Sequence, residues 1–221
     1  MMSEPSAPPA AMPSGARIDW YFDFISPFAY LQWQRLRREA PSLVIAAHPV
    51  LFAGLLKRWD NKGPVEIPPK RGWTYAHCLW IAHRHQIPMR LPSRHPFNPL
   101  PLLRLSIALN NSSDVVDRLF RFVWQDAHLP DESEHWAMLL QELDIREEAL
   151  SSDAVKSTLV ANGETAAAAG VFGVPTAVVD GQCFWGVDAT DMLFAYLRGD
   201  PFFSSADWQR AHSLPEGQQR R

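Results

Sequence analysis

The first regular pattern along the chain is an alternation of apolar and polar residues in RIDWYFDFIS, residues 17–26. A period of two is typical of a β-strand. Ser26 and Pro27 then supply a helix-capping residue and a proline at the first helical position, and apolar residues follow at helical spacing as far as Ala40. The pattern predicts a strand that passes into a helix at Ser26.

A second strand is predicted in the apolar run LVIAAHPV, residues 43–50, which follows Pro41 at the end of the predicted helix. Two strands joined by a helix form a unit in which the strands run parallel. The patterned part of the chain is therefore expected to open with a β-α-β unit.

Residues 51–169 have helical periodicity that prolines interrupt at intervals. The clearest helix is DVVDRLFRFVWQDA, residues 114–127, whose apolar residues gather on one face, and a second apolar stripe runs from Trp136 to Leu143. No segment in this range has the pattern of a convincing strand. The range is therefore predicted to be an all-helical insertion.

Two short apolar runs occur in GVFGVPTAVVDGQCFWG, residues 170–186, after an alanine-rich helix. Asp180-Gly181 between them is a two-residue hairpin signal, so the two strands are expected to be antiparallel. Asp188, with Asp191 three residues later, is predicted to cap and open a final helix.

The order β-α-β, helical insertion, α-β-β-α predicts the α/β class and a thioredoxin-like fold interrupted by a large helical domain. The thioredoxin-like domain is assigned residues 17–50 and 170–200, and the insertion domain is assigned residues 51–169. Residues 201–221 are predicted to be a C-terminal tail. Residues 1–16, rich in Pro, Ala and Ser without Lys or Arg, are predicted to be a disordered leader rather than a targeting signal.

Composition and charge narrow the class of ligand. The 221 residues carry a formal net charge of −3 with a pI near 6.2, so no basic surplus favours nucleic acid or an anionic membrane surface. No run approaches the roughly 20 apolar residues of a membrane-spanning helix. We therefore expect a cytoplasmic protein with a small-molecule site.

The cysteines and histidines indicate neither a disulfide framework nor a metal site. Cys78 and Cys183 belong to no CxxC pair and are interpreted as buried small apolar residues. His77, His83 and His85 lie near Cys78, but their spacing matches no zinc pattern. No metal is expected.

Candidate chemistry lies at Ser26. In thioredoxin-fold oxidoreductases a CxxC motif occupies the start of the first helix, whose N-terminus stabilises a thiolate. Here the four residues are Ser26-Pro27-Phe28-Ala29, so dithiol chemistry is impossible at this place. A hydroxyl and free backbone N–H groups remain, which suit a thiolate that a ligand brings. Taken by itself, Ser26 is better explained as an ordinary N-cap.

A second candidate element precedes the predicted hairpin. Pro175, in Gly173-Val174-Pro175-Thr176, stands at a strand start in the position of the cis-proline loop of this fold. A cis Val174-Pro175 bond would leave the N–H and C=O of Val174 free to pair with the backbone of a peptide-like ligand. The alternative is an ordinary proline that opens a strand.

Three segments carry a resemblance to a known family. WYFDFISPFAYL, GVFGVPT and FWGVDATDML are similar to the signature segments of 2-hydroxychromene-2-carboxylate isomerases and of their relatives, the kappa-class glutathione transferases. The similarity extends over nearly all of residues 17–198, and DNKGP, IPPKRGWTY and HQIPMRLP also occur in the family's order. The resemblance implies a DsbA-like thioredoxin fold, glutathione as cofactor and a homodimer.

The resemblance also implies roles for individual residues. Ser26 would contact the glutathione sulfur, Val174 would pair with the cysteinyl backbone, and Val187 with Asp188 would bind the γ-glutamyl end. The implied site comprises Ser26 as the catalytic residue; Ser26, Pro27, Phe28, Asn61, Val174, Pro175, Val187 and Asp188 around the cofactor; and Lys70 and Arg71 around the substrate.

Asn61, with Lys70 or Arg71, is placed by the resemblance beside the glutathione or the substrate carboxylate. These three residues lie in a proline-rich segment, where an ordinary solvated surface is the alternative. For Asp188 the alternative role is the helix cap already described, and we expect it to serve both roles.

The sequence departs from the family at the predicted last helix. Isomerases commonly have WGNDR where this chain has Trp185-Gly186-Val187-Asp188-Ala189, so a polar side chain and an arginine are lost. The backbone N–H groups of Val187 and Asp188 would remain available to glutathione. Substrate choice is therefore more affected than cofactor binding.

The reaction implied by the resemblance is isomerisation of a 2-hydroxychromene carboxylate to its open benzylidenepyruvate. Reversible addition of the glutathione thiolate turns a double bond into a rotatable single bond, and elimination restores it in the other geometry. Trp73, Trp80 and Trp185 could wall an aromatic pocket, although tryptophans more often build the core. Two alternatives stay open: a kappa-class-like transferase or peroxidase, and a non-catalytic thioredoxin-fold module that binds peptides or partner proteins.

Overall fold

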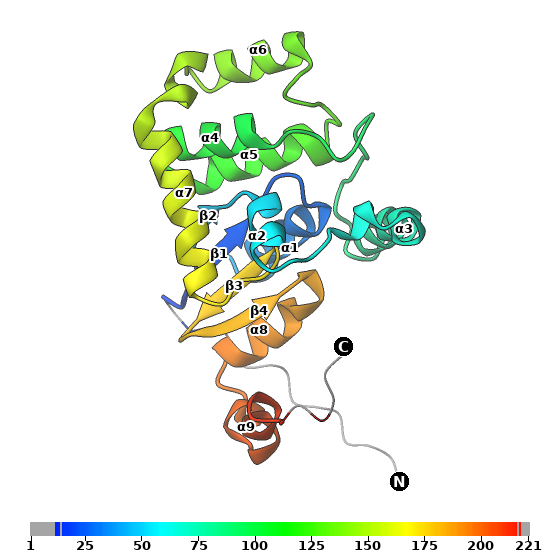
Figure 1. Ribbon diagram of the computed structural model, residues 1–221, viewed down its shortest axis with the longest axis vertical. Helices are drawn as coiled ribbons and strands as arrows, with labels where there is room; N and C mark the ends of the chain where they lie inside the picture. The colour runs from blue at the N-terminus through cyan, green and yellow to red at the C-terminus, as the bar shows by residue number, and fades with distance from the viewer. Residues whose placement is uncertain (1–11, 14, 216, 218–221) are drawn as a thin grey trace.

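The computed structural model describes residues 12–13, 15–215 and 217, so most of the predicted leader, residues 1–16, lies outside the described residues. A central sheet lies between a helical layer and the C-terminal helices (Figure 1). The elements are, in chain order, β1 (Arg17–Phe22), α1 (Pro27–Glu39), β2 (Val44–Pro49), α2 (Phe52–Arg58), η1 (Pro64–Glu66), α3 (Pro68–Arg84), α4 (Leu100–Ala108), α5 (Ser113–Trp124), α6 (Ser133–Glu142), η2 (Glu147–Ser151), α7 (Asp153–Ala168), β3 (Thr176–Val179), β4 (Gln182–Trp185), η3 (Val187–Ala189), α8 (Thr190–Leu197), η4 (Pro201–Ser204) and α9 (Ala206–His212).

The four strands form one mixed sheet in the order β2-β1-β3-β4. β1 runs parallel to β2 and antiparallel to β3, and β3 runs antiparallel to β4. Asp180 and Gly181 turn the β3–β4 hairpin with φ of +49° and +76°, the left-handed values that a two-residue turn of this kind requires. The predicted parallel unit and the predicted hairpin are both confirmed.

Helices cover both faces of the sheet, and the alternation along β1 decides which side chain meets which face. Trp20 stacks on Trp33 of α1 with ring centroids 5.1 Å apart, and Phe120 of α5 lies 6.1 Å from Trp20. On the opposite face Tyr21 packs in a smaller apolar cluster that includes Ala166 of α7. Adjacent residues of β1 therefore belong to two different apolar clusters, one on each face of the sheet.

The helical layer comprises α4, α5, α6 and the first part of α7, which then descends along the sheet (Figure 1). All of residues 51–169 are described, and every regular element among them is helical, as the periodicity predicted. None of the described helices combines the length and apolar character needed to cross a membrane.

The first strand is shorter than the alternation predicted. β1 ends at Phe22 rather than continuing to Ser26, because the carboxyl of Asp23 accepts a hydrogen bond from the N–H of Ile25 at 3.0 Å and turns the chain. Phe24 still faces the core and is fully buried. The alternation of apolar and polar residues therefore extends beyond Phe22, the last residue of β1.

The predicted C-terminal tail contains regular structure. η4 and α9 follow α8, and their aromatic rings pack on the thioredoxin-like part of the molecule. Phe203 lies 5.1 Å from Tyr196 of α8 and 5.0 Å from Trp208 of α9, measured between ring centroids. Aromatic packing therefore holds this segment against α8.

Candidate functional site

Ser26 is the N-cap of α1, as predicted. Its backbone is extended, and its Oγ accepts a hydrogen bond from the N–H of Ala29 at 3.2 Å. Pro27 has no N–H to donate, and the N–H of Phe28 has no partner among the described residues. A serine hydroxyl, a free backbone donor and the positive end of a helix dipole therefore lie together, an arrangement that suits an anion such as a thiolate.

A buried carboxyl precedes this helix terminus by three residues. Asp23 is fully buried, and its two carboxyl oxygens accept hydrogen bonds from the N–H of Ile25 at 3.0 Å and of Phe52 at 2.9 Å. The carboxyl thus joins the end of β1 to the start of α2. Burial raises the pKa of Asp23 to about 7, although both N–H groups act to lower it.

Val174 and Pro175 lie at the same edge of the sheet as Ser26. Their peptide bond is cis, which confirms that prediction. Because β1 and β3 are antiparallel, with Tyr21 opposite Thr176, the end of β1 that leads to Ser26 lies beside the residue after Pro175. Neither the N–H nor the C=O of Val174 has a hydrogen-bond partner in the part of the chain that the structure describes.

η3 lies beside the same loop. The N–H of Gly186 donates to the carbonyl of Pro175 at 2.9 Å, and Gly186 has a φ of +92°, which favours glycine. The N–H groups of Val187 and Asp188 have no partner within the described range. The two N–H groups at the start of η3 are therefore available to an acceptor on a ligand.

The prediction that Asp188 caps the last helix is wrong. η3 intervenes, and α8 begins only at Thr190, with no side-chain hydrogen bond at its cap. Asp191, the other half of the predicted capping pair, instead pairs with Arg35 of α1. The helical turn η3 therefore takes the place of the predicted cap, and the helix starts at Thr190 instead of at Asp188.

Polar side chains on the buried face of α1 hold η3 in place. Gln32 accepts a hydrogen bond from the indole N–H of Trp20 at 2.7 Å and donates to the carbonyl of Gly186 at 2.8 Å. Arg35, which is also buried, pairs with Glu39 at 2.9 Å and with Asp191. α1 therefore positions both the Ser26 terminus and the free N–H groups of η3.

Arg71 and His95 support the loop that leads to Ser26. The Nε2–H of His95 donates to the carbonyl of Ile25 at 2.8 Å, and its Nδ1 lies 2.9 Å from the hydroxyl of Tyr75. Arg71 donates to the backbone carbonyl of His95. Burial lowers the pKa of His95, and the charge of Arg71 lowers it further. One N–H of the Arg71 guanidinium therefore supports this loop, and the side chain stays exposed with further donors.

Asn61 and Lys70 are both exposed. Two residues before Asn61, the indole N–H of Trp59 donates to the carbonyl of Val171 at 3.1 Å, which holds this loop near the one that leads to Val174. Lys70 lies in the first turn of α3, and its ammonium has no hydrogen bond or ion pair among the residues described. The structure thus places Asn61 in a loop tied to the Val174 loop and leaves Lys70 at the surface.

Aromatic side chains extend from the helix terminus along α3. The ring of His77 lies 6.0 Å from Phe28, 4.6 Å from Trp73 and 6.1 Å from Trp80, measured between centroids. Trp73 and Trp80 are 64% and 53% exposed, and the buried Nδ1 of His77 has no partner within the described residues. An open aromatic surface therefore begins beside the Ser26 terminus, whereas Trp185 is exposed at the end of β4.

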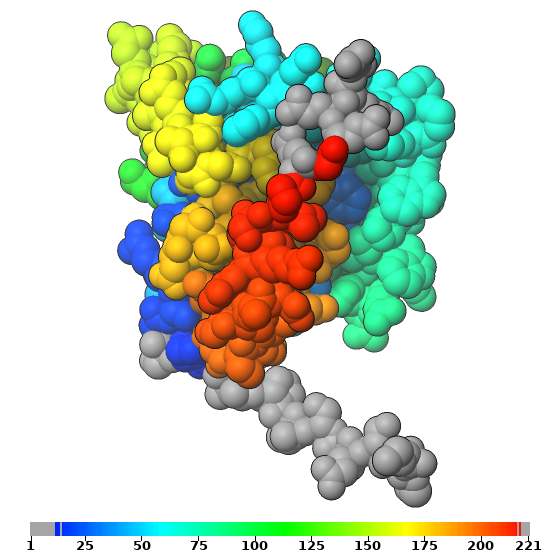
Figure 2. Space-filling view, turned by 60° about the horizontal axis from the view of Figure 1, so that its bottom comes forward, coloured from blue at the N-terminus to red at the C-terminus, as the bar shows by residue number. Residues whose placement is uncertain are grey.

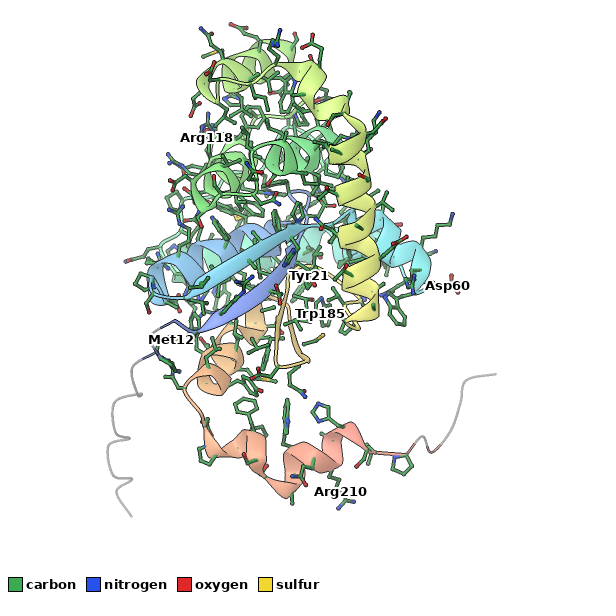
Figure 3. All side chains as sticks on the ribbon, turned by 90° about the vertical axis from the view of Figure 1, so that its left-hand side faces the viewer. Met12, Tyr21, Asp60, Arg118, Trp185 and Arg210 are labelled. Carbon is green, nitrogen blue, oxygen red and sulfur yellow. The ribbon has the colours of Figure 1, made fainter. Side chains whose placement is uncertain are left out.

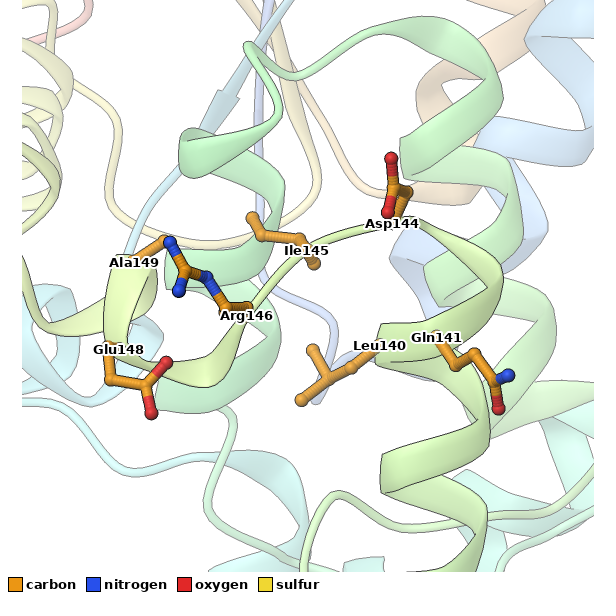
Figure 4. A pocket seen from close by; sticks show the side chains of 7 residues that line it. All are labelled: Leu140, Gln141, Asp144, Ile145, Arg146, Glu148 and Ala149. Carbon is orange, nitrogen blue, oxygen red and sulfur yellow. The ribbon is translucent and has the colours of Figure 1, made fainter.

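The β1–α1 segment is recessed at the surface. In Figure 2 its blue atoms are visible in a depression between the teal atoms of α3 and the gold atoms of β3 and β4. Two cavities lie in the helical layer. One of about 730 Å³ lies between α6 and η2 (Figure 4), and its lining offers no thiol, hydroxyl or imidazole. It is lined by Leu140, Gln141, Asp144, Ile145, Arg146, Glu148 and Ala149.

The sequence patterns did not indicate Asp23, Gln32 or His95 as functional residues. Asp23 occupied an ordinary polar position of an alternating segment. Gln32 and His95 act on residues 154 and 70 positions away along the chain. Contacts between residues so far apart along the chain leave no pattern in the local sequence.

Comparisons with known proteins agree with this fold. The family model for the DSBA-like thioredoxin domain matches residues 17–198. A 2-hydroxychromene-2-carboxylate isomerase of Pseudomonas sp. (strain C18) is 28% identical over 193 residues, which cover 83% of this chain and 91% of that protein. Glutathione S-transferase kappa 1 of Rattus norvegicus is 24% identical over 211 residues, which cover 85% of this chain and 93% of that protein.

A solved structure supports the same relationship. The structure of a 2-hydroxychromene-2-carboxylate isomerase superposes with a TM-score of 0.71 at 26% identity, and the match covers 87% of this chain and 98% of that one. The resemblance and the fold class expected from the sequence are therefore confirmed.

Proposed function

Since the chain belongs to the family of DSBA-like thioredoxin domains, we propose that it is an isomerase that uses glutathione as its cofactor. The observation that carries the proposal is the pairing of two features at one edge of the sheet. Ser26 stands at the helix terminus where redox relatives have cysteine, and beside it lies the backbone of Val174, which has no hydrogen-bond partner among the described residues. The proposed substrates are aromatic carboxylates of the 2-hydroxychromene-2-carboxylate class.

The pattern of free backbone groups supports a peptide-like cofactor. Backbone N–H and C=O groups in buried regions nearly always have partners, so groups without partners at one site suggest a ligand. Val174 would pair with the cysteinyl backbone of glutathione. The N–H groups of Val187 and Asp188 would receive the γ-glutamyl carboxylate, and Phe28 N–H would face the sulfur.

Bound glutathione supplies a thiolate that can add reversibly to a conjugated system. The Ser26 hydroxyl and the N-terminus of α1 would lower the pKa of that thiol, because both favour its charged form. Trp73 and Trp80 would contact the aromatic part of the substrate. Lys70 and Arg71 would bind the substrate carboxylate, because the ammonium of Lys70 is exposed and the guanidinium of Arg71 keeps further N–H donors beside the one that the carbonyl of His95 accepts.

Two measurements on the purified protein test this function. Calorimetry should detect glutathione binding at millimolar concentration or below. Absorbance should show conversion of 2-hydroxychromene-2-carboxylate to its open isomer only when glutathione is present. Absence of glutathione binding would contradict the proposal and favour a module that binds peptides or partner proteins at the same edge.

The similarity to the rat kappa-class enzyme favours a second candidate, a glutathione transferase or peroxidase. Ser26 and Val174 would bind glutathione in the same way, and only the second substrate would differ. Turnover of an electrophilic aromatic halide or a peroxide, without chromene turnover, would select this candidate. A homodimer and a cytoplasmic location stay predictions, and light scattering tests the first of them.

A further inference from the structure

Four side chains of α3 form a row along one face of the helix. Trp73, His77, Trp80 and Arg84 follow one another at spacings of three and four residues, which makes them neighbours on the helix surface. The ring of His77 lies 4.6 Å from Trp73 and 6.1 Å from Trp80, measured between centroids. The guanidinium carbon of Arg84 lies 5.5 Å from the centroid of Trp80. These four residues are called the α3 row below.

The α3 row begins beside the site proposed for glutathione. The ring of His77 lies 6.0 Å from that of Phe28, the second residue of α1, whose N–H has no partner among the described residues. An exposed cation, Lys70, lies in the first turn of α3. The cavities of the helical layer are elsewhere: in Figure 3 Arg118, which lines one of them, lies away from the sheet.

His77 is the polar group of the row that lacks a partner. Its Nδ1 is buried and forms no hydrogen bond within the described residues. An unpaired buried polar atom is destabilising, and such atoms are uncommon in folded proteins. Trp73 and Trp80 on either side are 64% and 53% exposed, so both rings are open to a ligand. Aromatic rings around a few polar atoms are the usual lining of a site for a small aromatic molecule.

We propose that His77 recognises an oxygen atom of the aromatic substrate, which binds along the α3 row. The inference rests on the proposed function, because it places this substrate next to the sulfur of glutathione. 2-Hydroxychromene-2-carboxylate has a ring oxygen that accepts a hydrogen bond and a hydroxyl that donates one, and a neutral imidazole has a nitrogen suited to either. The row would therefore select oxygen-bearing aromatic carboxylates over hydrocarbon ones of the same shape.

The other groups around His77 have complementary roles in the proposed site. A rise of about 1.5 Å per residue separates Trp73 from Trp80 by about 10 Å along the helix axis, so an aromatic ligand can stack on either ring. The side chain of Trp73 is mostly exposed, and in the bound state we expect it to rotate and make room for the ligand oxygen at Nδ1. The carboxylate of the ligand would meet the ammonium of Lys70.

Two stable ligands of nearly equal shape isolate the contribution of this hydrogen bond. Chromone-2-carboxylate has a ring oxygen and a carbonyl oxygen, whereas naphthalene-2-carboxylate has neither. Calorimetry, with and without glutathione, should give a Kd for the chromone about fivefold below that for the naphthalene, as one hydrogen bond provides. His77→Phe should remove this preference and His77→Asn should keep part of it, because its amide lies near the position of Nδ1. Trp73→Ala should weaken both ligands by similar factors.

His83→Phe, at an exposed residue of α3 outside the row, is the matched control and should keep the preference. Equal Kd values for the two ligands in the unaltered protein would overturn the inference, as would a preference that survives His77→Phe. A Trp73→Ala variant with a changed mass by light scattering and unchanged Kd values would also overturn it, and would assign the row to contacts between copies of this chain.

The binding measurements do not depend on turnover, so the two proposals can fail separately. Chromene turnover with glutathione, combined with equal Kd values for the two ligands, would overturn the role of His77 alone. A preference for the chromone that His77→Phe removes, in a protein without chromene turnover, would support the role of His77 and contradict the proposed reaction.

Discussion

At the scale of single residues, Ser26 combines two roles that a substitution can separate. Its Oγ accepts the N–H of Ala29, which is the role of an N-cap. Its hydroxyl proton is free to donate, which is the role proposed for it toward a thiolate. The first role concerns stability at every pH, whereas the second concerns turnover only where the thiol would otherwise keep its proton.

Ser26→Ala should cost about 1 kcal/mol of unfolding free energy through loss of the cap. Glutathione-dependent turnover should fall steeply at neutral pH, and the loss should shrink as pH rises and the bound thiol ionises unaided. A pH–rate profile measures this. Ser112→Ala removes the cap of α5 and is the matched control, since it should cost similar stability without changing the profile. A Ser26→Ala rate parallel to the unaltered enzyme at every pH would refute the thiolate role.

The raised pKa of Asp23 predicts that the free energy of unfolding decreases as the pH rises. Its pKa is raised from 3.8 to about 7 in the folded protein, so between these values the folded state holds more proton than the unfolded state. The contribution of Asp23 to the free energy of unfolding is therefore fully present below about pH 4 and is lost as pH rises through 7. The full change is at most about 4 kcal/mol.

Asp23→Asn should remove this slope, because an amide does not titrate. It should also lose one of the two backbone hydrogen bonds, because its NH₂ would face an N–H donor. Urea unfolding between pH 4.5 and 8 provides the measurement. Asp144→Asn, at an exposed carboxyl, is the control and should keep the slope. An unchanged slope in Asp23→Asn would assign the pH dependence to another group.

At the scale of elements, α1 determines the geometry of the site from its two sides. Its N-terminus presents Ser26, and its buried face binds η3 through Gln32 and Arg35. The Val174 loop is fixed in turn, because the carbonyl of Pro175 accepts the N–H of Gly186. One helix therefore orients three groups that are far apart along the chain.

Gln32→Leu should weaken glutathione binding through η3. The substitution leaves the indole N–H of Trp20 without a partner and leaves the carbonyl of Gly186 with only the N–H of Ala189, at a cost of about 2–3 kcal/mol in stability. We expect the glutathione Kd to rise about fivefold, which corresponds to about 1 kcal/mol. Calorimetry on folded protein measures it. Gln34→Leu loses a bond to Asp117 of α5 instead and should keep the Kd; equal Kd values for both variants would contradict this role of η3.

At the scale of the whole molecule, the sheet and the helical layer share one apolar core. Phe120 of α5 packs on Trp20, Phe22 and Phe24. The indole N–H of Trp124, at the end of α5, donates to the carbonyl of Phe24 at 2.8 Å in a fully buried position. The insertion is thus continuous with the sheet and helps to shape the segment that leads to Ser26.

A shared core predicts one unfolding transition for the sheet and the helices. Far-UV circular dichroism and tryptophan fluorescence should give coincident thermal curves. Trp124→Phe leaves the buried carbonyl of Phe24 without its donor, at a cost of about 2 kcal/mol, and both curves should shift together by about 4–8 °C. Trp80→Phe, at an exposed ring, should shift neither. Two separate transitions would show that the layers unfold independently.

The sequence by itself determined the features that depend on neighbouring residues. The Ser26-Pro27 cap, the helical periodicity of the insertion and the Asp180-Gly181 turn each rest on contacts within a few positions. These features arise from local backbone conformation and from the burial of one face of an element. Both causes act within a short segment of the chain. The resemblance carried by three short motifs added the expectation that Val174, Val187 and Asp188 bind glutathione.

Only the tertiary structure decided the features that depend on distant residues. Asp23 acquires its raised pKa because the fold excludes water from its carboxyl, and this effect outweighs the opposing hydrogen bond from the N–H of Phe52. Arg71 meets the carbonyl of His95, and η3 displaces the helix start from Asp188, because partners of large sequence separation compete with the local preference. Desolvation and pairing energies are properties of the packed interior, and a local pattern of residue types does not contain them.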